Sequence, residues 1–71
     1  MIRVNEIISS CKDNDRITRI GIIDHGDLLT IPARSDLLHN YRMRVVKSWK
    51  LHEGVENHLI LFLELKGGSE Q

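Results

Sequence analysis

Apolar and polar residues alternate along two segments in the last third of the chain, residues 41–51 and 57–65. A period of two predicts β-strands, and the short polar segment 52–56 between them predicts an antiparallel hairpin. One face of this hairpin is apolar along most of its length, so we expect it to form the core. Its members are Met43, Val45, Trp49, Leu51, Leu59, Leu61, Leu63 and Leu65.

The opposite face of the hairpin is partly apolar too, because Val46, Ile60 and Phe62 lie among its charged side chains. An antiparallel sheet with one solvated face is normally polar on that side, so we expect something to cover this one. Two covers fit: the N-terminal strands of the same chain, closing a barrel or sandwich, or a second molecule. A symmetric loop predicts the cross-strand pairs Trp49–Leu59, Val45–Leu63, Val46–Phe62 and Arg44–Glu64, unless the register slips by one pair.

The first twelve residues fit two patterns. Val4, Ile7, Ile8 and Cys11 have helical spacing, whereas Ile2, Val4 and Ile8 also fit one side of a strand. We interpret the segment as a strand, because a polar turn at residues 12–15 and a run with four isoleucines at residues 16–24 follow it. This run is apolar on both sides, so we expect it in the interior of the sheet.

Turn and helix signals divide the middle of the chain. Residues 24–27 read as a tight turn in which Gly26 takes a positive φ, and residues 28–31 return as a strand that Pro32 ends. Ser35 then has the position of an N-cap for a helix of about two turns. That helix is expected to bury Leu37, Leu38 and Tyr41.

These elements predict an α+β fold that is mostly antiparallel β, with about five strands in a small sheet or barrel and one short helix between the third and fourth strands. We assign residues 1–66 to a single small domain and residues 67–71 to a disordered C-terminal tail.

The composition narrows the class of protein. A chain of 71 residues supports only a small core, and its single cysteine, Cys11, excludes an intrachain disulfide, so oligomerisation is the expected source of further buried surface. Ten basic and ten acidic residues give no overall attraction to nucleic acid or to acidic membranes. With no signal-peptide pattern at residue 1 and no apolar run of membrane-spanning length, the expected location is the cytoplasm.

A basic segment suggests an alternative function. Arg34, Arg42, Arg44 and Lys50 carry positive charge along and before one strand, and such a row can follow the phosphates of single-stranded nucleic acid. Base stacking needs exposed aromatic rings, however, and Trp49 falls on the expected core face. Nucleic-acid binding is therefore the second hypothesis.

No pattern in the chain supports catalysis, and we expect no catalytic residue, no cofactor and no metal. Asp24, His25 and Asp27 are typical of a solvated turn, and Cys11 is expected to pack as a half-buried apolar side chain. Lys47 interrupts the core face, so we expect it near a sheet edge with its ammonium in water.

The sequence therefore favours a small non-enzymatic interaction or regulatory protein that binds another macromolecule. We expect a homo-oligomer assembled through the C-terminal hairpin, with Phe62 at the centre of the contact. The predicted interface residues are Val46, His58, Ile60 and Phe62.

Overall fold

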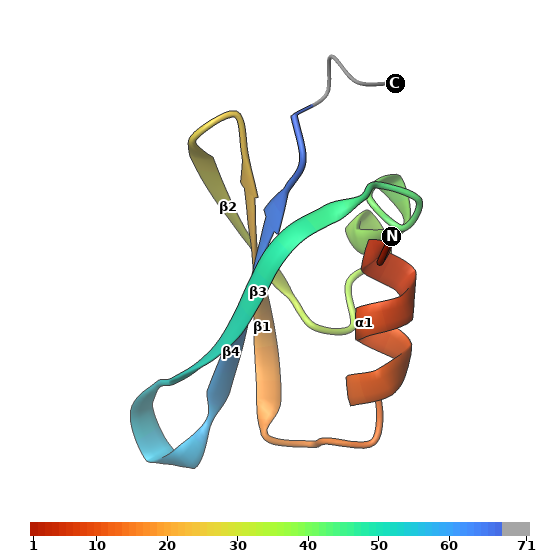
Figure 1. Ribbon diagram of the computed structural model, residues 1–71. Helices are drawn as coiled ribbons and strands as arrows, with labels where there is room; N and C mark the ends of the chain where they lie inside the picture. Colours follow the sequence, from red (N-terminus) through yellow and green to blue (C-terminus); the bar gives the residue numbers. More distant parts are fainter. Residues whose placement is uncertain (68–71) are drawn as a thin grey trace.

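The computed structural model describes residues 1–67, which fold into a four-stranded mixed sheet with its helices on one side (Figure 1). The strand order is β2–β1–β4–β3; β1 and β4 run parallel, and the two outer pairings are antiparallel. The elements are α1 (Val4–Cys11), β1 (Ile17–Asp24), β2 (Asp27–Pro32), a 3-10 helix at Asp36–Asn40, β3 (Val46–Glu53), a 3-10 turn at Val55–Asn57 and β4 (Leu59–Leu65).

The predicted α+β class is confirmed, but the prediction of about five strands is wrong. The segment interpreted as the first strand is the helix α1, and the sheet is open, not closed into a barrel. Of the tail predicted at residues 67–71, residues 68–71 lie outside the described part of the chain.

The N-terminal segment forms the helix α1 because a helix buries more of its apolar side chains than a strand would. Val4 and Ile7 are both buried in the core, whereas a strand would have directed them to opposite sides. The Glu6 carboxylate accepts a hydrogen bond from the backbone N of Arg3 at 2.7 Å, which satisfies a free donor at the start of the helix. The backbone O of Ile2 accepts from Val46 N at 2.8 Å, so the start of α1 is attached to β3.

The turn between β1 and β2 has the predicted form. His25 and Gly26 have φ of 54° and 84°, and Asp24 pairs with Asp27 across them. Two central residues with positive φ match the twist of a two-residue hairpin. β1 lies between β2 and β4, so its predicted interior position is confirmed.

The predicted short helix is present between β2 and β3, as a single 3-10 helix capped by Ser35. The Ser35 hydroxyl accepts a hydrogen bond from Leu37 N at 3.1 Å. Leu38 is buried and Tyr41 half-buried, but Leu37 is exposed, because a five-residue helix directs only part of its surface to the core.

The predicted register of the C-terminal hairpin is wrong. Trp49 lies opposite Leu63, four residues along β4 from the expected Leu59, and β3 extends to Glu53 before the chain turns. The ladder is interrupted between Val46 and Ser48, which leaves Lys47 as an extra residue. The extra residue moves the side chains that precede it to the other side of the sheet. Val46 therefore lies opposite Leu65, in the core.

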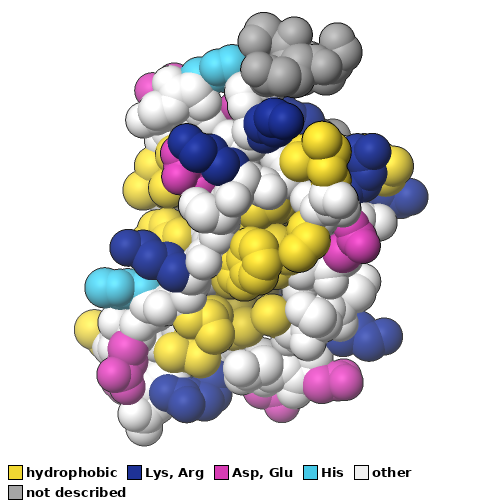
Figure 2. Space-filling view, viewed as in Figure 1, with side chains coloured by type: hydrophobic (Ala, Val, Ile, Leu, Met, Phe, Trp, Pro, Cys, Tyr) yellow, Lys and Arg dark blue, Asp and Glu magenta, His cyan; other side chains and the backbone are white. Residues whose placement is uncertain are grey.

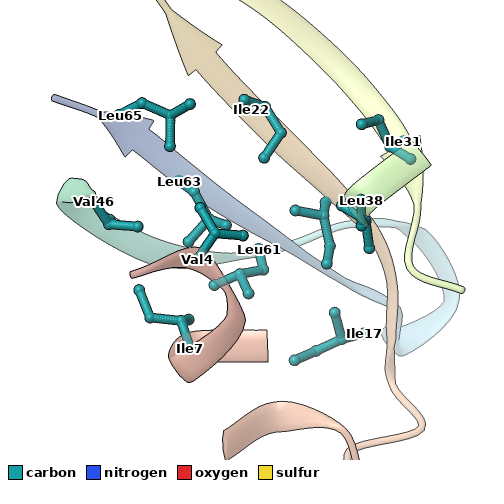
Figure 3. Close-up of a cluster of buried hydrophobic side chains, with 11 residues drawn as sticks. Val4, Ile7, Ile17, Ile22, Ile31, Leu38, Val46, Leu61, Leu63 and Leu65 are labelled. Atoms are coloured by element: carbon teal, nitrogen blue, oxygen red, sulfur yellow. The ribbon is translucent and has the colours of Figure 1, made fainter. Parts of the chain in front are cut away.

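The core lies between α1 and one face of the sheet (Figure 3). Its central side chains come from β1 and β4, and α1 and the Asp36–Asn40 helix cover them. Half-buried Cys11 packs against this cluster, as predicted. The buried residues are Val4, Ile7, Ile17, Ile20, Ile22, Ile31, Leu38, Val46, Leu61, Leu63 and Leu65.

Candidate functional site: the open face of the sheet

The other face of the sheet carries no helix in the structure of residues 1–67, and we call it the open face (Figure 1). Both α1 and the Asp36–Asn40 helix contribute side chains to the core on the opposite side. The hypothesis that the N-terminal strands cover this face is wrong, because β1 and β2 belong to the same sheet. By the strand registers, the open face consists of Arg19, Gly21, Ile23, Leu28, Thr30, Pro32, Ser48, Lys50, His52, Ile60, Phe62 and Glu64.

Phe62 lies near the centre of the open face, against the backbone of its neighbour Gly21. A Cβ atom at position 21 would lie 2.6 Å from Phe62 Cδ1 and 3.2 Å from Leu28 Cδ1. The ring of His52 meets the Phe62 ring edge to face, with 6.1 Å between centroids. Phe62 therefore lies across β1 instead of projecting into solvent, and this is possible only because residue 21 has no side chain.

Four apolar side chains form a diagonal stripe across three strands of the open face. The stripe runs from Ile60 and Phe62 on β4 to Ile23 on β1 and Leu28 on β2. In the sheet register Phe62 pairs with Gly21, and Ile23, two residues further along β1, pairs with Leu28. Leu28 is 57% exposed, and the other three are partly exposed. We call these four residues the apolar stripe.

Charged residues lie on both flanks of the apolar stripe. Arg19 is level with Ile60 on one flank, and Glu64 is level with Ile23 on the other. The Glu64 carboxylate accepts a hydrogen bond from Ser48 Oγ at 3.1 Å and lies 3.8 Å from Lys47 Nζ. A hollow of about 390 Å³ opens on the Glu64 flank, lined by Ile23, Ser48, Trp49, Lys50, Phe62 and Glu64.

The structure separates the four predicted interface residues. Ile60 and Phe62 are on the open face, and His58 is exposed just before β4. Val46 is 7% exposed in the core, so its assignment to the second face was wrong, and the bulge at Lys47 is the reason. Lys47 itself is exposed on the edge strand β3, as predicted.

The four residues of the predicted nucleic-acid surface do not share one surface either. Arg34 and Arg42 line a cleft beside α1, whereas Lys50 is on the open face. The prediction that Arg44 pairs with Glu64 is wrong. The Arg44 guanidinium instead donates to both carboxylate oxygens of Asp24, at 3.0 and 3.2 Å.

This forked contact determines the electrostatics of the β1–β2 turn. The hydrogen bonds from Arg44, together with its charge, lower the pKa of Asp24 from its ordinary value of 3.8. His25 Nε2 lies 3.7 Å from the same carboxylate. Within residues 1–67, no three side chains of His, Cys, Asp or Glu gather in an arrangement suited to a metal ion.

The free edge of β3 is a second partly apolar region. Trp49 and Leu51 are each 50% exposed, although they share the α1 side of the sheet with buried Leu61 and Leu63. Figure 2 shows hydrophobic side chains gathered in the middle of the view, where β3 crosses in Figure 1. The helix α1 covers the two central strands and leaves this edge half open.

Three members of the site were missed from the sequence: Gly21, Ile23 and Leu28. An isolated glycine within a strand pattern signals a close approach, and Gly21 carried that signal. Ile23 and Leu28 had none, since their place beside Phe62 depends on the parallel pairing of β1 with β4.

Comparison with protein-family models, with curated proteins and with solved structures found no match to this chain. Among residues 1–67, no helix has the length and apolar character needed to cross a membrane.

Proposed function

We propose that the protein is a small non-enzymatic interaction protein, and that the macromolecule bound by its open face is a second copy of the same chain. The observation that carries the proposal is the central position of Phe62 in an apolar stripe that no other part of residues 1–67 covers. Covering such a stripe removes apolar area from water, at about 25 cal/mol per Å². Two sheets stacked about 10 Å apart form a sandwich with the two stripes between them.

The placement of charge supports a second copy as the partner. Arg19 and Glu64 lie on opposite flanks of the apolar stripe. A two-fold axis along the stripe exchanges the flanks, so the Glu64 flank of one protomer meets the Arg19 flank of the other. Each such contact occurs twice in an isologous dimer. The same surface therefore supplies the apolar centre and one pair of opposite charges at its rim, while Lys50 on the Glu64 flank adds a positive charge to that side.

The size of the molecule supports the same partner. A stable interface of standard size buries about 800 Å² on each partner. The molecule measures 38 × 22 × 20 Å and exposes 5050 Å² in total, so an interface of that size would cover about a sixth of its surface. A dimer would give this small chain a second buried layer, which its own helices do not provide.

The test is light scattering coupled to size-exclusion chromatography at about 100 μM protein, with absorbance at 260 and 280 nm. The wild type should have twice the 8.2 kDa chain mass. Phe62→Glu and Leu28→Glu should each give a monomer, because either places a charge in the stripe. The matched control is Val55→Glu, at a site that is 77% exposed outside the sheet, and it should stay dimeric.

Leu28→Glu keeps the test valid if Phe62→Glu unfolds, since Leu28 is largely exposed and circular dichroism reports the fold. A monomeric wild type would contradict the proposal. So would a dimer that both stripe variants leave intact, or a particle whose mass comes from bound nucleic acid.

A further inference from the structure

Two hydrogen bonds at the ends of β4 show which of its residues face β3. Leu59 N donates to the carbonyl of Arg16, the residue before β1, and Lys66 N donates to the carbonyl of Val45, the residue before β3. Successive residues of a strand direct their backbone groups to opposite sides. The even-numbered residues of β4 therefore bond to β3, and the odd-numbered residues face β1.

The outer edge of β3 is left with free backbone groups. The residues of β3 that pair with the even-numbered residues of β4 are Ser48, Lys50 and His52. The N–H and C=O groups of Trp49, Leu51 and Glu53 therefore point away from the sheet. No backbone hydrogen bond reaches them from elsewhere in residues 1–67. A bare edge of this kind is a template for another strand.

The chain already adds an extended segment to the first part of the same edge. Val46 N donates to the Ile2 carbonyl at 2.8 Å, and Val4 N donates to the Arg44 carbonyl at 3.0 Å. This N-terminal segment runs antiparallel to the chain that leads into β3. Residues 49–53 are the part of the edge that remains without a partner strand.

Apolar side chains flank the free part of the edge on the α1 side of the sheet. Trp49 and Leu51 are half exposed there, because α1 covers only the central strands. In an added strand every second side chain would lie on this side of the sheet. Apolar residues at those positions would cover Trp49 and Leu51.

Positive side chains flank the same edge on the side of the open face. Lys50 forms no ion pair within residues 1–67, and the Lys47 side chain is two-thirds exposed. Residues 47–52 contain two lysines, one histidine and no acidic residue. Acidic residues on this side of an added strand would therefore form favourable cross-strand pairs.

A second copy of β3 fits this edge poorly. Antiparallel pairing of two copies that uses all the free backbone groups is centred on Leu51. It places each Lys50 beside His52 of the other copy, and each Trp49 beside a Glu53. Like charges and an apolar–acidic pair face each other in that arrangement, so the edge favours a different chain.

We propose that the free edge of β3 binds an extended segment of another protein as an added antiparallel strand, apolar on the α1 side and acidic on the other. Its backbone bonds to Trp49, Leu51 and Glu53, and its acidic side chains lie beside Lys50. Main-chain bonds give such strand addition its affinity, and alternate side chains give it specificity. The added strand lies outside β3 and does not touch the apolar stripe, so the proposed dimer can fail without affecting it.

The test uses the synthetic peptide Ac-TTVEVET-NH2, whose valines are placed opposite Trp49 and Leu51 and whose first glutamate is placed opposite Lys50. Fluorescence of Trp49, the single tryptophan of the chain, measures affinity and should saturate below about 1 mM peptide. Hydrogen exchange of ¹⁵N-labelled protein identifies the bonds. The amides of Trp49, Leu51 and Glu53 should exchange rapidly in the free protein and slowly in the complex.

Modified peptides separate strand addition from other modes of binding. N-methylation of either valine removes a donor that points to β3, and it should weaken binding about tenfold. N-methylation of the glutamate between them is the matched control, because that N–H points away and its loss should leave binding unchanged. A peptide with lysines in place of both glutamates should bind at least about tenfold more weakly.

Two variants of the protein test the edge itself. Leu51→Pro removes an N–H that points to the free edge, so β3 keeps its bonds to β4 while peptide binding is lost. Its matched control is Thr30→Pro on the other edge strand, β2, which should bind the peptide normally. Lys50→Glu keeps the test valid if Leu51→Pro fails to fold by circular dichroism, and it should weaken binding about tenfold.

Three results would overturn the proposal. One is the absence of saturable binding at about 2 mM peptide, and another is equal binding of the peptides N-methylated at valine and at glutamate. The third is protection of the Trp49, Leu51 and Glu53 amides in the free protein that disappears on dilution, since it would assign the edge to a second copy.

Discussion

The ring of Phe62 lies against Gly21 so closely that a Cβ at residue 21 would be 2.6 Å from Phe62 Cδ1 and 2.8 Å from Cε1. The two residues are level with each other in the parallel pairing of β1 with β4. The glycine thus sets the height of the aromatic ring above the sheet, and with it the shape of the open face.

Gly21→Ala should destabilise the fold by about 1 kcal/mol, because the added methyl displaces the Phe62 ring. In a Phe62→Ala background the same substitution should be neutral or slightly stabilising, since the clash is gone and alanine restricts the unfolded chain. Urea unfolding of the four proteins measures this coupling. Equal effects in both backgrounds would mean that the ring does not rest on Gly21.

Asp24→Asn should reduce the acid sensitivity of the protein. Arg44 lowers the pKa of Asp24 in the folded state, so the pair contributes stability that is complete above the ordinary value of 3.8 and is lost as the pH falls through the lowered pKa. The melting temperature should therefore fall less between pH 6 and pH 2 in the variant than in the wild type.

The control for this experiment is Asp27→Asn, on the other side of the same turn, because Asp27 forms no ion pair within residues 1–67. It should keep the wild-type acid response. A variant at Asp24 that loses stability in acid as steeply as the wild type would show that Arg44 does not hold the carboxylate.

Leu61→Ala should cost about 3 kcal/mol of unfolding free energy, because Leu61 is 1% exposed and its removal leaves a cavity. Leu51 lies directly opposite on β3 and is 50% exposed, so Leu51→Ala should cost less than about 1 kcal/mol. Chemical denaturation of both variants checks the contrast. Similar losses would mean that the edge of β3 is as well covered as the centre of the sheet.

Ser35→Ala should destabilise the protein by about 1 kcal/mol, because it removes the hydroxyl that accepts from Leu37 N at 3.1 Å. Ser35→Asp keeps an acceptor at the same position and should retain most of the stability. Thermal unfolding distinguishes the two, and an equal loss in both variants would assign the effect of Ser35 to something other than capping.

Local signals predicted local structure well. Gly26 and Ser35 each mark a feature that depends on a few adjacent residues, and the structure has a two-residue turn at His25 and Gly26 and a capped 3-10 helix after Ser35. The expectation that Phe62 lies on a second, partly apolar face also follows from simple alternation, and the register bears it out.

The remaining features depend on contacts between distant segments, which alternation does not encode. The bulge at Lys47 places Val46 in the core, and no residue in that strand marks an insertion. The choice between helix and strand at α1 depended on which arrangement buries both Val4 and Ile7, and this is decided by a sheet built from later residues. For the same reason, the pairing of β1 with β4 and the extent of the open face could not be predicted.

The last strand in the chain, β4, lies between β1 and β3 in the sheet, so the order of synthesis and the order of assembly differ. Ile17 at the start of β1 pairs with Leu59, so β1 and β2 are synthesised before the strand that lies beside β1 in the sheet. Until then, β1 has a bare edge and the core lacks Leu61, Leu63 and Leu65. Folding should consequently be a single late step, limited by closing the long loop between β1 and β4, and nascent chains that end before residue 59 should bind chaperones.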